Sequence, residues 1–226
     1  MLTNAPCTTP EQARQIICEL GKRFYDLGWV SGTGGGIAIR LDDRVYMAAS
    51  GVQKELLCPQ DIYEIDLQGE VRAGPPSSSG LCVSACRPLF LAAMRQRNAG
   101  AVIHSHSRSA LLTTLLHQNF FEVTHLEMMK GIRGVGFHDA HQVPIIENTA
   151  HEADLADSLS DAIEAWPNAQ GVLVRRHGLY VWGQDWREAK RHAECYDYLF
   201  DVAMQMRQLG HDASKSPNED AAKARP

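Results

Sequence analysis

The chain has 226 residues, a formal net charge of −5, and a mixed composition with 44% hydrophobic and 22% charged residues. This length is enough to bury a substantial core within one domain. No basic run is present, which argues against nucleic acid as a partner, because clustered Lys and Arg supply that affinity. No apolar stretch reaches the roughly eighteen residues of a membrane span. The first twelve residues lack the pattern of a secretory signal.

The predicted elements begin with a helix after Thr9, where Thr9 and Gln12 form a capping-box pair and Pro10 takes the first helical position. Its apolar residues keep helical spacing up to Gly28. Alternating apolar residues then predict strands over 36–40 and 44–48, joined as a hairpin.

Further along the chain, strand and helix signals alternate without regular βαβ units. Strands are predicted over 63–67, 101–106, 143–146 and 171–174, with a helix over 87–97. Thr149 and Glu152 open a third helix by capping-box spacing, and Asp185 and Glu188 open a long last helix that ends at Gly210. The pattern indicates a layered α/β fold in which helices flank a largely antiparallel sheet.

The domain boundary is placed at residue 210. Residues 1–210 are expected to form one catalytic domain. Residues 211–226 are polar and lack an apolar period, so they are expected to be a disordered tail.

The cysteines are spread along the chain and contain no Cys-x-x-Cys pair. This usage is typical of reduced thiols in a cytoplasmic protein. The six positions are Cys7, Cys18, Cys58, Cys82, Cys86 and Cys195.

His104 and His106 stand at the end of the apolar strand 101–106. Side chains two apart on a strand point to the same face, so both imidazoles can bind one metal ion. A catalytic zinc takes three protein ligands and leaves one position open for substrate. The spacing therefore predicts a catalytic metal site, although a pair of ordinary surface histidines has the same pattern.

The third ligand is open among four histidines on spacing alone. His177 is favoured, because it also follows an apolar strand and precedes a glycine that lets the backbone bend. His138 and His141, in a polar stretch flanked by glycine, are the main rivals, and His125 is the fourth candidate.

Glu127 is a lone carboxylate among the apolar residues of THLEMMKG, residues 124–131. Burial would raise the pKa of this carboxyl and suit it to acid/base work, while the alternative is an ordinary surface charge.

Two glycine-containing segments, 32–36 and 50–54, are candidate anion cradles. Backbone N–H groups beside glycines can approach a phosphate, and Lys54 adds a positive charge. Neither segment matches a nucleotide-binding fingerprint, and either one could be a simple turn.

Several segments, in this order, make the chain resemble the class II aldolase/adducin superfamily, and within it the methylthioribulose-1-phosphate dehydratase branch. They are GWVSGTGGGIAIR (28–40), ASGVQKE (49–55), SACRPLF (84–90), GAVIHSHS (100–107), THLEMMKGI (124–132), VPIIENT (143–149), VLVRRHGLYVWG (172–183) and ECYDYLFD (194–201). One departure lies in the loop before Cys86, where basic residues are expected and the chain has Ser77-Ser78-Ser79-Gly80.

The resemblance implies a zinc-dependent enzyme of methionine salvage. The reaction that the resemblance implies is dehydration of 5-methylthioribulose 1-phosphate to 2,3-diketo-5-methylthiopentyl 1-phosphate. It implies one Zn²⁺ per subunit and a cytoplasmic homotetramer with active sites near subunit interfaces. The residues implied are zinc ligands His104, His106 and His177, acid/base Glu127, substrate contact Cys86, and phosphate contacts Gly34, Gly35, Ser50, Gly51 and Lys54.

Two alternatives share the implied fold. A class II sugar-phosphate aldolase would cleave a carbon–carbon bond, but its usual glutamate is not found at position 86. A non-catalytic adducin-like interaction module would not need the three histidines and Glu127.

Overall fold

The structure, a computed structural model, describes residues 5–223. Its helices are α1 (Pro10–Asp26), α2 (Arg87–Gln96), α3 (Arg108–Leu116), α4 (Ala156–Ala165), α5 (Trp186–Gln208) and α6 (Pro217–Lys223). Its strands are β1 (Gly36–Leu41), β2 (Arg44–Ser50), β3 (Ile62–Asp66), β4 (Val71–Ala73), β5 (Cys82–Val83), β6 (Ala101–Ser105), β7 (Phe120–Val123), β8 (His141–Ile146), β9 (Gly171–Val174) and β10 (Gly178–Gly183).

Within the described residues the strands form one sheet in the order β4-β3-β2-β1-β6-β10-β9-β8-β7, and β5 also pairs with β2. The paired strands run antiparallel except β8 and β9, which are parallel. The predicted α/β class with a largely antiparallel sheet is confirmed. The central strand β6 lies between β1 and β10, with His104 opposite Gly36 on one side and Tyr180 on the other.

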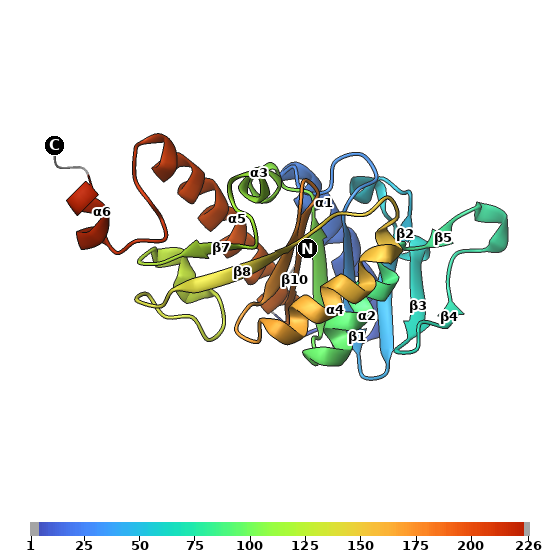
Figure 1. Ribbon diagram of the computed structural model, residues 1–226. Coiled ribbons are helices and arrows are strands. Elements are labelled where there is room, and N and C mark those ends of the chain that lie inside the picture. The colour runs from blue at the N-terminus through green and yellow to red at the C-terminus, as the bar shows by residue number, and fades with distance from the viewer. Residues whose placement is uncertain (1–4, 224–226) are drawn as a thin grey trace.

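Helices cover both faces of this sheet, α1, α3 and α5 on one side and α2 and α4 on the other (Figure 1). Each face of the sheet has its own hydrophobic core, and successive residues of β6 point to opposite faces. Ile103 packs toward α1 and α5, whereas Val102 packs toward α2 and α4. His104 is two residues beyond Val102, so its side chain points to the α2–α4 side.

The two long helices begin where their capping residues predict. Thr9 and Gln12 make both capping-box hydrogen bonds at the start of α1, and the Asp185 carboxylate accepts from the N–H groups of Arg187 and Glu188 at the start of α5. These contacts satisfy N–H groups that have no partner inside a helix. No helix among residues 5–223 is long and apolar enough to cross a membrane.

The third predicted helix begins later than its sequence signal. The Thr149 hydroxyl donates to the carbonyl oxygen of His151 rather than capping a helix. A 3-10 turn, η5 (Glu152–Leu155), follows, and α4 begins only at Ala156. The Glu152 side chain is thereby free to face the interior.

The segment after Gly210 differs from the expected disordered tail. Ala213 is buried in the α1–α5 core, and its carbonyl oxygen accepts from the Thr124 N–H at 2.9 Å. His211 contacts the Asp220 carboxylate at 2.6 Å, just within helix α6. The segment therefore packs on the domain through one small apolar residue and a local ion pair, although its sequence has no apolar period. Residues 224–226 lie outside the described part.

Candidate metal centre

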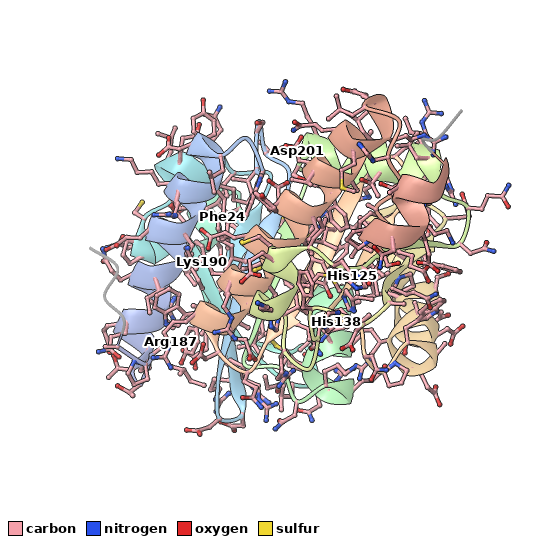
Figure 2. The ribbon with its side chains drawn as sticks, turned by 90° about the vertical axis from the view of Figure 1, so that its left-hand side faces the viewer. Phe24, His125, His138, Arg187, Lys190 and Asp201 are labelled. Carbon is pink, nitrogen blue, oxygen red and sulfur yellow. The ribbon has the colours of Figure 1, made fainter. Side chains whose placement is uncertain are left out.

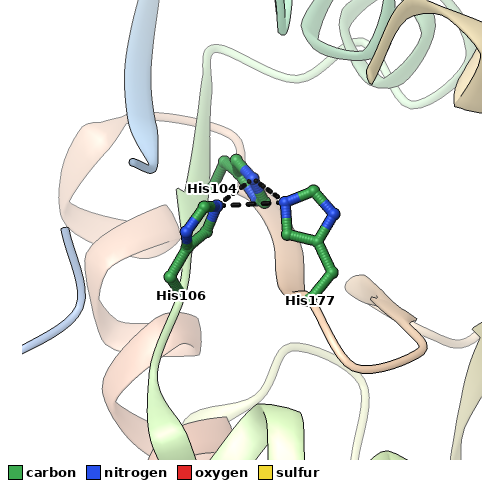
Figure 3. Close-up of side chains that lie close together, drawn as sticks. All are labelled: His104, His106 and His177. Carbon is green, nitrogen blue, oxygen red and sulfur yellow. Dashed lines mark hydrogen bonds between the residues drawn. The ribbon is translucent and has the colours of Figure 1, made fainter. Parts of the chain in front are cut away.

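Three histidines meet where β6 and the β9–β10 hairpin end (Figure 3). His104 is in β6, His106 follows that strand, and His177 lies in the tight turn between β9 and β10. Gly178 allows this approach, because a Cβ there would lie 2.0 Å from the Ser105 carbonyl oxygen. The glycine after His177 therefore serves close packing of the hairpin against β6.

The Nε2 atoms of the three rings face one another. They are 2.9 Å apart between His104 and His106, 3.2 Å between His104 and His177, and 3.0 Å between His106 and His177. Two ligands in a tetrahedral zinc site, each about 2.05 Å from the ion, lie about 3.3 Å apart. The cluster is slightly tighter than that and fits a small divalent cation.

The hydrogen bonds of the Nδ1 atoms determine which nitrogen of each ring carries the proton. His104 Nδ1 lies 3.2 Å from the Leu179 carbonyl oxygen, and His177 Nδ1 lies 3.1 Å from Asn148 Oδ1. A carbonyl oxygen only accepts, so each Nδ1 carries the proton and each Nε2 presents a lone pair. Lone pairs that face one another repel unless a cation lies between them, so this tautomer pattern suits a metal ligand set.

Burial keeps these rings neutral. Burial and then the neighbouring histidines lower the pKa of His106 to about 3, and the same causes lower the pKa of His177 to about 4. Neutral imidazole is the form that binds metal. The ligand form is therefore the resting form of both rings at neutral pH.

The glycine segment 32–36 lies directly against the histidines. A Cβ at Gly34 would be 2.5 Å from His106 Nδ1, and one at Gly35 would be 2.8 Å from the His104 carbonyl oxygen. Gly35 also has a φ of +68°, which favours glycine. The structure thus brings this segment to the site, as the phosphate assignment requires.

Lys54 joins that segment to the loop after β2. Its side chain is buried, and Nζ donates to the carbonyl oxygens of Thr33 at 2.9 Å and Val52 at 3.0 Å. Burial lowers the pKa of Lys54. Ser50, the last residue of β2, and Gly51, with a φ of +68°, lie at the start of the same loop.

Cys86 lies at the start of α2, buried, with Sγ 3.1 Å from Glu152 Oε1. Burial, followed by the nearby Glu152 carboxylate, raises the pKa of the Cys86 thiol to about 12. Cys86 is therefore a neutral hydrogen-bond donor at neutral pH.

Glu152 belongs to the site but escaped the sequence interpretation. Its Oε1 lies 3.1 Å from His104 Nε2 and accepts a hydrogen bond from the Tyr180 hydroxyl. The Tyr180 hydroxyl and the Cys86 thiol both donate to this oxygen, which favours the charged carboxylate. The spacing of Thr149 and Glu152 imitates a capping box, which hid this role.

Glu127 is not buried in the single chain, contrary to expectation. Its side chain is 73% exposed and pairs with Lys130 Nζ at 2.9 Å. It begins the 3-10 turn η4 (Glu127–Gly131), which is held to α5 by a hydrogen bond from Arg191 to the Gly131 carbonyl oxygen. This turn belongs to the α5 side of the sheet, whereas the histidine cluster opens on the α2–α4 side.

The rival histidines lie away from this cluster. His125 Nε2 and His138 Nδ1 are 3.1 Å apart, and both residues lie on the face of the molecule that carries α5 (Figure 2). His141 is buried with Nε2 3.0 Å from the Tyr196 hydroxyl. None of the three joins a group of possible metal ligands among the described residues.

A family profile described as "Class II Aldolase and Adducin N-terminal domain" matches residues 15–204. The chain belongs to this family.

Its relatives include proteins named methylthioribulose-1-phosphate dehydratase. The one from Osmerus mordax is 49% identical over 222 residues, covering 95% of this chain and 92% of the relative. The one from Gallus gallus is 49% identical, covering 90% of this chain and 87% of the relative. The recognition of this branch from the sequence is confirmed.

Solved structures of the same fold are more distant in sequence. An L-fuculose 1-phosphate aldolase superposes with a TM-score of 0.75 at 19% identity over 98% of both chains. A second, from Thermus thermophilus, gives 0.70 at 22% identity over 87% of this chain and 95% of that one. At these identities the likeness concerns the fold alone.

Proposed function

We propose that the chain is a metal-dependent hydro-lyase. It converts 5-methylthioribulose 1-phosphate to 2,3-diketo-5-methylthiopentyl 1-phosphate, a step of methionine salvage. The observation that carries the proposal is the convergence of three histidine Nε2 atoms, in a chain 49% identical to dehydratases of that name.

His104, His106 and His177 would hold the metal, which we propose to be one Zn²⁺ per subunit. The donor set fits, because three imidazoles at tetrahedral spacing leave a position open for substrate. When bound, Zn²⁺ would supply Lewis acidity that stabilises negative charge on the oxygens of the ketose.

The two glycine-containing loops would hold the phosphate. Lys54 Nζ uses two of its three N–H bonds on Thr33 and Val52, which leaves one for a phosphate oxygen. Gly34 packs against the His106 ring and Gly35 against the His104 carbonyl oxygen, and Ser50 and Gly51 begin the loop that leads to Lys54. Cys86, a neutral thiol at the same site, would contact the substrate chain.

Glu127 would act on a substrate bound to a second copy of the chain. Its exposure and its place on the α5 side separate it from the histidines of its own chain. A homotetramer with sites at subunit contacts resolves this separation, because an exposed carboxylate can enter a neighbour's site. Glu127 would then donate the proton that the C4 hydroxyl needs to leave as water.

We also propose that the protein is cytoplasmic. This location is supported by six cysteines that are all free thiols in the structure.

The test is a dehydration assay on zinc-loaded and chelated enzyme. The proposal expects diketone formation from 5-methylthioribulose 1-phosphate with metal and none after chelation. An aldolase would instead release dihydroxyacetone phosphate from a suitable sugar phosphate. That result, or diketone formation unaffected by chelation, would contradict the proposal.

A further inference from the structure

A polar cluster lies beside the histidines on the α2–α4 side of the sheet, centred on Glu152. Three contacts fall on one carboxylate oxygen, Oε1: the Cys86 thiol at 3.1 Å, His104 Nε2 at 3.1 Å, and the Tyr180 hydroxyl. Within residues 5–223 these contacts all fall on Oε1, so the other oxygen, Oε2, is open to a ligand. The Glu152 side chain is 23% exposed, so a substrate in the metal site can reach it.

Three separate elements hold this carboxylate in place. Tyr180, from β10, stacks on the His104 ring with centroids 4.0 Å apart and an interplanar angle of 6°. Cys86 lies at the start of α2, and Gly36 packs beside it. A Cβ at Gly36 would lie 3.1 Å from Phe90 and 3.8 Å from the Cys86 sulfur. Leu155 buries the other end of η5 in the core. A carboxylate fixed in this way is preorganised for chemistry rather than for solvent.

Loss of water from a ketose needs two proton movements. A base removes the proton on the carbon next to the carbonyl, and an acid protonates the hydroxyl that leaves from the following carbon. Glu127 can supply one of these groups from a second copy. Around His104, Cys86 and Tyr180 both act as donors to Glu152, so Glu152 is the group there with an oxygen available to accept a proton.

We propose that Glu152 is the base that takes the proton from C3 of the substrate. The inference rests on the proposed dehydration and assigns its first step. The C3–H bond breaks, its proton passes to Glu152 Oε2, and its electron pair forms the C2–C3 double bond as negative charge moves to the C2 oxygen. The charge on the C2 oxygen then re-forms the C2 carbonyl, the C2–C3 pair becomes a C3–C4 double bond, and the C4–O bond breaks. The departing hydroxyl takes a proton from the protonated carboxyl of Glu127 and leaves as water. The resulting C3 enol gains a proton at C4 and loses its hydroxyl proton, giving the diketone and one water.

The two proton steps can be separated by replacing Glu127, which blocks loss of the hydroxyl but leaves C3 deprotonation reversible. Zinc-loaded Glu127→Gln, incubated with 5-methylthioribulose 1-phosphate in D₂O, should exchange the C3 proton without forming diketone. The exchange is followed by proton NMR. Adding Glu152→Gln should slow this exchange by about 100-fold or more, the usual contribution of a general base.

Glutamine at 152 can still accept from Cys86 and Tyr180, so zinc content and substrate binding by calorimetry should match those of Glu127→Gln alone. Glu152→Asp, with a carboxylate one methylene shorter, should restore part of the exchange. Glu164→Gln, a matched change at an exposed position of α4, should leave exchange unchanged.

Equal exchange with and without Glu152→Gln would overturn the assignment, as would absence of exchange in Glu127→Gln with substrate bound. Failure of the wild-type, zinc-loaded enzyme to form diketone would reject the proposed function itself, and the assignment with it. The wild-type assay thus tells the two failures apart.

Discussion

The histidine cluster and the segment around Glu127 differ in how the fold supports them. His104 lies in the central strand of the sheet, completely buried, and its ring is stacked on Tyr180. Glu127 lies in a 3-10 turn outside the sheet, where its carboxylate is exposed and pairs with Lys130. The three histidines that could hold a metal ion therefore come together within one chain, whereas the Glu127 side chain faces outward.

This difference agrees with the proposed division between metal binding by the histidines and proton transfer by Glu127. Metal ligands must be held tightly, because ligand distances and angles are narrowly fixed, and neighbouring strands give that rigidity. A group delivered by a second chain can be exposed in the first. Changes in the two regions should consequently have different signatures, one on metal binding and the other on turnover alone.

The largest expected effect comes from His104→Ala. It removes one of three ligands and the contact to the Leu179 carbonyl oxygen, so zinc content and dehydration should fall together to background. Metal analysis by plasma mass spectrometry and the diketone assay measure both. His138→Ala, a rival ligand by sequence that lies elsewhere, should retain zinc. Full zinc occupancy in His104→Ala would remove it from the ligand set.

Glu127→Gln should affect turnover only. Loss of one acid/base group lowers the rate by about 10²–10⁴-fold, while the zinc content should stay at the wild-type level. The measurement is kcat at saturating substrate, beside zinc content. Unchanged turnover would exclude Glu127 from the mechanism, and loss of zinc would link it to the metal half.

Asn148→Ala should weaken metal binding moderately. It removes the acceptor for His177 Nδ1, which fixes the orientation and tautomer of that ring. Loss of such a supporting contact typically lowers metal affinity by about 10–100-fold. Chelator competition gives the zinc Kd, with exposed Asn168→Ala as the control. An unaltered Kd would mean that His177 needs no support from Asn148.

The smallest effect concerns His141, where the segment bearing Glu127 rejoins the sheet in β8. Burial lowers the pKa of His141 from an ordinary 6.5 to about 4. Between pH 6.5 and pH 4 His141 is protonated in the unfolded chain but still neutral in the folded protein. The stabilisation is thus complete above pH 6.5 and declines as the pH falls toward 4, by up to about 1.4 kcal/mol per pH unit.

Urea unfolding of chelated protein across this pH range tests that statement. In His141→Gln the free energy of unfolding should depend less steeply on pH than in the wild type. An identical slope in both proteins would show that His141 does not contribute to acid sensitivity.

Much of the metal half could be predicted from the sequence, because its signals are local. The hairpin of β1 and β2, the His-x-His at the end of β6 and the glycine after His177 each follow from spacing and backbone geometry. Helix α3 could not be found in this way, since Leu112, Leu115 and Leu116 are exposed and blur its apolar face.

The remaining parts of the site depend on contacts between distant segments. Glu152 meets Cys86 and Tyr180 only after η5, α2 and β10 pack together, and its own spacing mimics a helix cap. Met129 near Glu127 is buried, and Leu126 and Met128 are partly buried, whereas the Glu127 side chain points out. A run of apolar residues does not tell which member faces the surface.

The most direct test of a site divided between two chains is to combine two inactive variants. Co-expressed His104→Ala and Glu127→Gln chains, purified through different tags, form mixed assemblies. A site is intact when its histidines come from one variant and its Glu127 from the other. Random assembly should then restore about a quarter of wild-type dehydration per site, because each half is intact with a chance of about one half. Activity no higher than the sum of the separate variants would contradict the account and place the whole site within one chain.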